Sequence, residues 1–70
     1  MSSNEKLLEI IALNVRNERF KQKLSQDDLA NLAGVSVNLI SNIENAKQNI
    51  GICNLNSIAI ALNKNLKDLL

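Results

Sequence analysis

Two very short helical segments on either side of a glycine limit what this chain can fold into. Ser25 and Asp28 have the spacing of a capping box, in which the serine and an acidic residue three positions later bond each other's backbone. Gly34 is a natural helix end because glycine adopts the left-handed conformation without steric cost. Ser36 can cap another short helix over about residues 37–45. The two segments therefore follow each other with a turn of only about three or four residues between them.

This arrangement is the sequence form of a helix-turn-helix over about residues 25–45, and further helices must complete its core. Helical spacing of apolar residues predicts a first helix from Ser2, Ser3 or Asn4 to about Gln22. The same spacing predicts a helix after the polar loop at 46–51, with Asn63 at its end and a final turn from Leu66 to Leu70. The inward positions are Leu7, Leu8, Ile11, Ala12, Val15 and Arg19 in the first helix, and Ile52, Leu55, Ile58, Ala59 and Leu62 in the later one. No alternation of period two persists, so we expect an all-α fold.

Composition excludes several classes of function. The 70 residues predict one domain, and there is no histidine and only one cysteine, Cys53, which we expect to be half-buried. These residues offer neither a zinc site of the usual Cys/His kind nor a pair of nucleophile and base, so we expect no enzyme, no metal and no cofactor. The acidic N-terminus is unlike a signal peptide and no long apolar run exists, so we expect a cytoplasmic protein without membrane contact. A net charge of +1 is too neutral to indicate a nucleic-acid partner by itself.

The order and spacing of several motifs resemble the Cro/C1-type (XRE) helix-turn-helix family of transcriptional regulators. The motifs are Leu24-Ser25-Gln26-Asp27-Asp28-Leu29-Ala30, Ala33-Gly34-Val35-Ser36, Ile40-Ser41, Ile43-Glu44 and Ile58-Ala59-Ile60-Ala61-Leu62, with Val15-Arg16 and Arg19 before them. The resemblance covers about residues 8–70. It implies an all-α, five-helix, lambda-repressor-like domain whose helices 2 and 3 bind double-stranded DNA.

The resemblance also implies which side chains read the bases. Helix 3 of the family lies in the major groove, and the matching outward residues here are Val37, Asn38, Ser41 and Asn42. Asparagine can bond adenine at N6 and N7, and valine can contact the thymine methyl. The alternative for each asparagine is a solvated side chain, since 12 of the 70 residues are asparagine. Helix 3 carries no lysine or arginine for a guanine contact, which favours A·T-leaning half-sites.

Phosphate contacts and one ion pair are implied in the same way. The candidate phosphate ligands are Gln26, Ser36, Asn45, Lys47, Asn49 and Arg16. Arg19 and Glu44 match a family ion pair that ties helix 1 to helix 3, so we expect their role to be structural. Lys23 and Ala46 stand where the family usually has glycine, and a left-handed backbone there would cost about 1 kcal/mol or more.

Low net charge and a small core favour a dimer on a palindromic operator, a repressor or controller. Its expected interface is the apolar surplus within residues 52–70, namely Ile52, Ile60, Leu66, Leu69 and Leu70. The short chain and Asn49-Ile50 are similar to restriction-modification controller proteins. The alternative function is an antitoxin or other protein-interaction module of the same fold, which would dock through Ile10, Leu13 and Phe20. Those three residues could instead be ordinary exposed side chains or contact the C-terminal segment.

Overall fold

The computed structural model describes residues 3–47 and 50–70, and it contains four α-helices and no strand in those ranges. The helices are α1 (Ser3–Lys21), α2 (Gln26–Ala33), α3 (Val37–Glu44) and α4 (Ile52–Ala61). The all-α prediction is confirmed. The final turn predicted from Leu66 to Leu70 is present as η1 (Leu66–Leu69), a 3-10 helix of 4 residues, so a count of five α-helices is not confirmed. In the described ranges no helix combines the length and apolar content needed to cross a bilayer.

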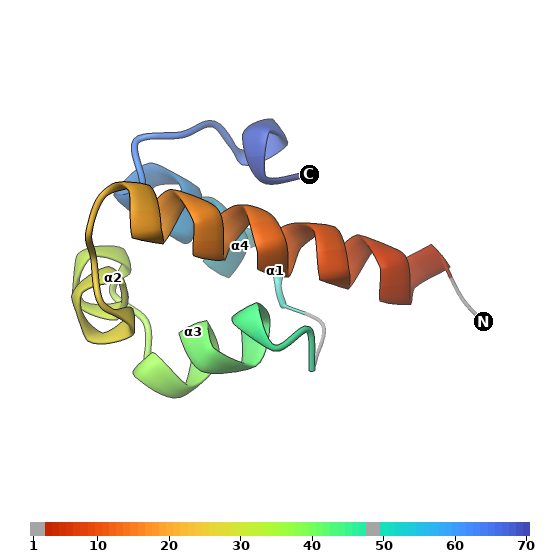
Figure 1. The fold of residues 1–70 in the computed structure, drawn as a ribbon, viewed down its shortest axis with the longest axis horizontal. Coiled ribbons are helices and arrows are strands. Elements are labelled where there is room, and N and C mark those ends of the chain that lie inside the picture. The colour runs from red at the N-terminus through yellow and green to blue at the C-terminus, as the bar shows by residue number, and fades with distance from the viewer. Residues whose placement is uncertain (1–2, 48–49) are drawn as a thin grey trace.

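The long helix α1 crosses the molecule between α3 and the C-terminal η1, and it packs against both (Figure 1). Helices α2 and α3 contact each other, α3 contacts α1, and α4 contacts α2. The C-terminal η1 folds back against α1 and α4, on the side of α1 opposite to α3 (Figure 1). The largest fully buried side chains come from all these elements; they are Val15, Leu29, Ile40, Ile58, Leu62 and Leu69.

The helix ends follow the local signals in the sequence. Asp28 N donates to Ser25 Oγ at 2.9 Å and Ser25 N donates to the Asp28 carboxylate at 3.0 Å, which closes the predicted capping box. Gly34 has φ 71°, the left-handed conformation that ends α2. Ser36 Oγ accepts from Leu39 N at 3.1 Å and caps α3. The capping box fixes the start of α2, whereas Gly34 and the Ser36 cap fix the turn of about three residues between α2 and α3.

Four burial predictions are wrong, and each error concerns the end of an element or a face without a covering partner. Leu7 is 43% exposed because the N-terminal part of α1 extends past the other helices (Figure 1). Ile52 is 67% exposed at the first position of α4, about two turns before the buried Ala59. Cys53 beside it is exposed rather than half-buried. Leu69 is only 1% exposed, because η1 packs it into the core, so it is not available to an interface between chains.

Candidate nucleic-acid interface

The outward face of α3 collects the residues that the sequence assigned to base contact. Ile40 and Ile43 face the core at 0% and 3% exposure, which turns the opposite side of this helix outward. Asn38 is exposed and Val37 is 40% exposed. Ser41 and Asn42, about one turn further on, are half-buried and continue the same face. The spacing brings all four predicted base-contacting residues to one side of the helix.

A hydrogen bond fixes one polar group on this face. Asn45 Nδ2 lies 3.4 Å from Ser41 Oγ and donates to it. The Ser41 hydroxyl therefore keeps its own proton for an outside acceptor. Asn45, the residue after the last turn of α3, is exposed and extends the polar face towards the loop that follows.

The N-terminus of α3 follows the turn that joins α2 to α3, and the N-terminus of α2 follows the turn that leaves α1. Backbone N–H groups in the first turn of a helix have no partner within that helix, and such ends bind anions readily. Gln26 is the first residue of α2, and Ser36 immediately precedes α3. Because Ser36 Oγ accepts from Leu39 N, its hydroxyl proton remains available to a phosphate oxygen.

Glu44 is the centre of a buried cluster that sequence reasoning described only in part. Arg19 donates to its carboxylate through Nε at 2.7 Å and through Nη2 at 2.8 Å, so the ion pair between α1 and α3 is bidentate. Gln26 Nε2 donates to Glu44 Oε1 at 3.2 Å. Arg16 Nη2 donates to the backbone oxygen of Glu44 at 2.7 Å. The spacing of Arg16 and Arg19, one turn apart on α1, is the sequence signal that could have indicated this shared target.

The ionisation of this cluster follows from its contacts. Burial by itself would raise the pKa of Glu44, but hydrogen bonds from Arg19 and Gln26, with the nearby positive charges of Arg19 and Arg16, bring that pKa below its ordinary value. The hydrogen bond to Glu44 raises the pKa of the Arg19 guanidinium, against the opposing effect of burial. At neutral pH the pair is thus fully charged.

The remaining phosphate candidates differ in their surroundings. Lys47 is exposed in the loop after α3. Arg16 is bound to the C-terminal end of α3, although its side chain is 42% exposed. Asn49 lies outside the described residues.

The helix-turn-helix family model matches residues 15–69, most of the chain and all of the surface described above. The chain belongs to this helix-turn-helix family. Its overall shape is the DNA-binding fold of the family, and the resemblance inferred from the motifs is confirmed.

Individual members of the helix-turn-helix family are similar to this chain in sequence and in structure. The chain is 37% identical over 62 residues to control protein C.SmaI of Serratia marcescens, covering 89% of this chain and 74% of that protein. It superposes with a TM-score of 0.86 and 27% identity on the restriction-modification controller protein C.AhdI from Aeromonas hydrophila, covering 90% of this chain and 96% of that one. It also matches an HTH_3 family transcriptional regulator from Vibrio cholerae with a TM-score of 0.89 and 29% identity, over 94% of this chain and 37% of the other.

Two further surfaces of this helix-turn-helix domain carry exposed apolar side chains. On the C-terminal surface, Ile52, Ile60 and Leu70 are 67%, 65% and 53% exposed, while Leu66 is half-buried. On the outer side of α1, a second set is exposed; its members are Ile10 at 40%, Leu13 at 55% and Phe20 at 60%. The Phe20 ring lies 4.5 Å from the guanidinium carbon of Arg19, the distance of a cation–π contact.

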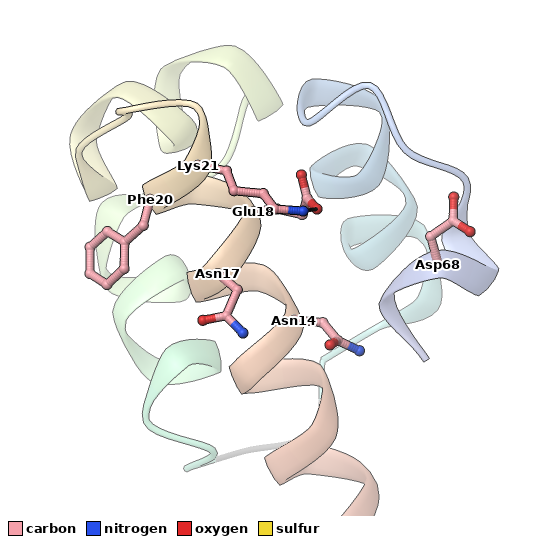
Figure 2. Close-up of a pocket in the computed structure, with 6 residues that line it drawn as sticks. All are labelled: Asn14, Asn17, Glu18, Phe20, Lys21 and Asp68. Carbon is pink, nitrogen blue, oxygen red and sulfur yellow. Dashed lines mark hydrogen bonds and ion pairs between the residues drawn. The ribbon is translucent and has the colours of Figure 1, made fainter.

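An open hollow of about 560 Å³ lies between α1 and η1, away from the helix-turn-helix (Figure 2). It is lined by Asn14, Asn17, Glu18, Phe20, Lys21 and Asp68, and Phe20 points to the opposite side of α1 from Asp68. Glu18 Oε2 pairs with Lys21 at 3.3 Å and with Lys64 at 3.7 Å, so the charges in this hollow largely neutralise each other. The hollow is thus a poor match to a phosphate backbone.

Proposed function

We propose that this chain is a sequence-specific, double-stranded DNA-binding regulator of transcription that acts as a dimer on a palindromic operator. The observation that supports this most directly is the outward face of α3, the second helix of the helix-turn-helix. Asn38, Ser41 and Asn42 lie together on this face. This helix presents its N-terminal residues as a recognition helix does when it enters the major groove. The named relatives support the role of a controller of a restriction-modification system.

The chemistry of α3 favours A·T-leaning half-sites. The asparagine amides at positions 38 and 42 can each donate to adenine N7 and accept from adenine N6, and Val37 fits against a thymine methyl. None of the residues of α3 is a lysine or arginine, so the commonest contact to guanine is missing from this helix. Discrimination at each asparagine is then worth about 1–3 kcal/mol.

Phosphate contacts are proposed for Gln26, Ser36, Asn45, Lys47 and Asn49, with Arg16 a weaker candidate because Glu44 holds it. Only Lys47 and Arg16 of these carry a charge. Since the logarithm of affinity falls with salt in proportion to the number of neutralised phosphates, we expect a shallow salt dependence. The affinity of one chain would be low, which is the physical reason for two copies on one operator.

The proposed dimer interface is the exposed apolar surface at the C-terminus, formed by Ile52, Ile60 and Leu70 with Leu66 at its edge. Leu69 is withdrawn from this set, because its side chain is already part of the core. Covering these side chains would remove apolar area from water, which would stabilise the dimer by about 25 cal/mol per Å² of apolar area buried.

Selection from random duplex DNA at a stated salt concentration tests the proposal. We expect enrichment of a palindrome whose half-sites lie about one helical turn apart, with A·T pairs at the positions nearest to Asn38 and Asn42. Recovery of no preferred sequence by the dimeric protein would overturn the proposal.

A protein-interaction module of the same fold, such as an antitoxin, is the second candidate. The exposed apolar residues Ile10, Leu13 and Phe20 on α1 favour it, because they lie outside both the α3 face and the C-terminal surface. Co-purification of one stoichiometric protein that is released by Leu13→Asp, together with no sequence preference for DNA, would decide for this function.

A further inference from the structure

The amide of Gln26 is held from the far end of α3. Its Nε2 atom donates to Glu44 Oε1 at 3.2 Å, and the same oxygen accepts from Arg19 Nη2 at 2.8 Å. Glu44 is 3% exposed, whereas Gln26 is half-buried at the first position of α2. The contact therefore joins a fixed interior carboxylate to a side chain at the edge of the DNA-binding surface.

A carboxylate can hold an amide in only one of its two orientations. Ionised glutamate accepts hydrogen bonds and has no proton to give, so Gln26 must turn its NH2 group rather than its carbonyl oxygen towards Glu44. One hydrogen of this NH2 group is used in that bond, and the second remains. A DNA phosphate is likewise an acceptor only, so it needs a donor, and a flipped amide would present an oxygen to it.

We infer that Glu44 is a positioning residue for DNA binding, which orients the side-chain amide of Gln26 so that its remaining N–H is available to a backbone phosphate. The inference rests on the proposed function, because it requires DNA at the N-terminus of α2. Glu44 itself touches no DNA in this scheme. A continuous chain of hydrogen bonds runs from Arg19 on α1 through Glu44 on α3 to Gln26 on α2.

Arg19 makes the carboxylate a rigid anchor, because two of its N–H groups bind the two oxygens of Glu44. The lowered pKa of Glu44 keeps it in the acceptor-only form at neutral pH, with burial opposing and the hydrogen bonds from Arg19 and Gln26 favouring ionisation. Glu44 thus couples the scaffold to the phosphate contact, beyond its part in the ion pair.

A double-mutant cycle in DNA affinity tests this coupling. The four proteins are the wild type, Glu44→Gln, Gln26→Ala and the double variant, each measured on the sequence that the wild type selects. We expect either single change to weaken binding by about tenfold, the size of one hydrogen bond to a charged group. The double variant should bind no more weakly than Gln26→Ala, because Glu44 acts through an amide that is no longer there. The matched control is Gln22→Ala, whose Nε2 donates to the backbone oxygen of Leu62 instead and whose removal should leave DNA affinity unchanged.

A purely structural role predicts something different. If Glu44 only stabilised the fold, Glu44→Gln would weaken binding by the same factor in both backgrounds, and that result would overturn the inference. Equal binding by the wild type and Gln26→Ala would overturn it too, while leaving the proposed function intact. Failure of the wild type to select any DNA would instead overturn the proposed function.

A measurement on the unmodified protein covers the case in which Glu44→Gln does not fold. The two side-chain N–H resonances of Gln26 can be followed by NMR. We expect one of them to exchange slowly in the free protein and the other to shift when selected DNA is added. Identical, rapidly exchanging resonances that DNA leaves unmoved would contradict the inference.

Discussion

Arg19 on α1 and Glu44 at the end of α3 are joined inside the protein by two hydrogen bonds, of 2.7 Å from Nε and 2.8 Å from Nη2. Arg19 is 8% exposed and Glu44 is 3% exposed. Arg19 also donates through Nη1 to the backbone oxygen of Leu24 at 2.8 Å, in the turn before α2. One guanidinium therefore ties α1, the turn that leads into α2 and the C-terminal end of α3 together.

Breaking this pair from either side should destabilise the protein strongly. Arg19→Met or Glu44→Leu alone leaves a buried charge without its partner, and we expect each to cost about 3–5 kcal/mol in the free energy of unfolding. The double variant should lose much less than the sum, because it leaves neither charge. Urea unfolding of the four proteins measures this. Small and additive losses of unfolding free energy in the variants would show that the pair contributes little to stability.

The same pair predicts how stability depends on pH. The pKa of Glu44 lies below the ordinary value of 4.5, so folding favours its ionised form. Its contribution is present in full above a pH of about 4.5 and is lost as the pH falls through the folded-state pKa. The pKa of Arg19 is raised by its hydrogen bond to Glu44, so Arg19 stays charged throughout the acid range and does not affect this titration. We expect the difference in unfolding free energy between wild type and Glu44→Gln to shrink as the pH falls below about 4.5 and through the folded-state pKa of Glu44.

Asp28 supplies the control for this titration. Hydrogen bonds from the backbone and the side chain of Ser25 lower the pKa of Asp28 below 3.8, so its contribution to stability is likewise lost as the pH falls. Asp28→Asn should therefore remove part of the acid sensitivity while leaving the difference due to Glu44 in place. A difference between wild type and Glu44→Gln that stayed constant with pH would contradict the assignment.

The features of the fold that depend on local contacts could be predicted from the sequence. Ser25, Asp28 and Gly34 depend on partners within a few residues of chain, and both caps of α2 form as predicted. Lys23 and Ala46 take the left-handed backbone, at φ 58° and 55°, that the missing glycines suggested. Each of these signals can be read without knowing how the helices pack.

Burial at the ends of elements could not be read in this way. Leu69 is buried because the C-terminal turn folds back on α1, where Asn14 Nδ2 donates to the Leu69 backbone oxygen at 3.0 Å across 55 residues of sequence. The link from Gln26 to Glu44 likewise joins two helices over 18 residues. The roles of Asn38 and Asn42 stay predictions, since base discrimination depends on contacts with DNA.

Glycine should be preferred at Ala46. A left-handed backbone costs an L-residue about 1–2 kcal/mol, and glycine avoids this cost. Part of the resulting gain in stability is offset by the greater freedom of glycine in the unfolded chain. We expect Ala46→Gly to raise the free energy of unfolding by about 0.5–1 kcal/mol. The control is Glu9→Gly at an exposed position in the middle of α1, where glycine should lower the free energy of unfolding by about 0.5 kcal/mol. A loss at both positions would contradict the reasoning.

The C-terminal surface should control the oligomeric state. Ile60 is 65% exposed on this surface, and Ile60→Asp places a charge in the proposed interface between two chains. We expect the dimer to dissociate at least tenfold more readily in sedimentation equilibrium, because an unpaired charge would have to be buried there. Leu32→Asp is the matched control, since Leu32 is 61% exposed on α2, outside the proposed interface. Equal weakening by both variants would point to a general effect of charge.

Base readout and phosphate contact should separate in the variants of Asn38 and Lys47. Asn38→Ala removes a base contact, so we expect the selected site to become degenerate at one position in each half-site, with a loss of about 5- to 150-fold on the preferred sequence. Lys47→Ala removes a proposed phosphate contact, so it should weaken binding to all sequences alike and reduce the salt slope by about one per chain. Binding curves on selected and scrambled duplexes at several salt concentrations measure both effects. If both variants weakened every sequence by one factor, the division of labour between α3 and the loop after it would be wrong, because a base contact must distinguish sequences whereas a phosphate contact cannot.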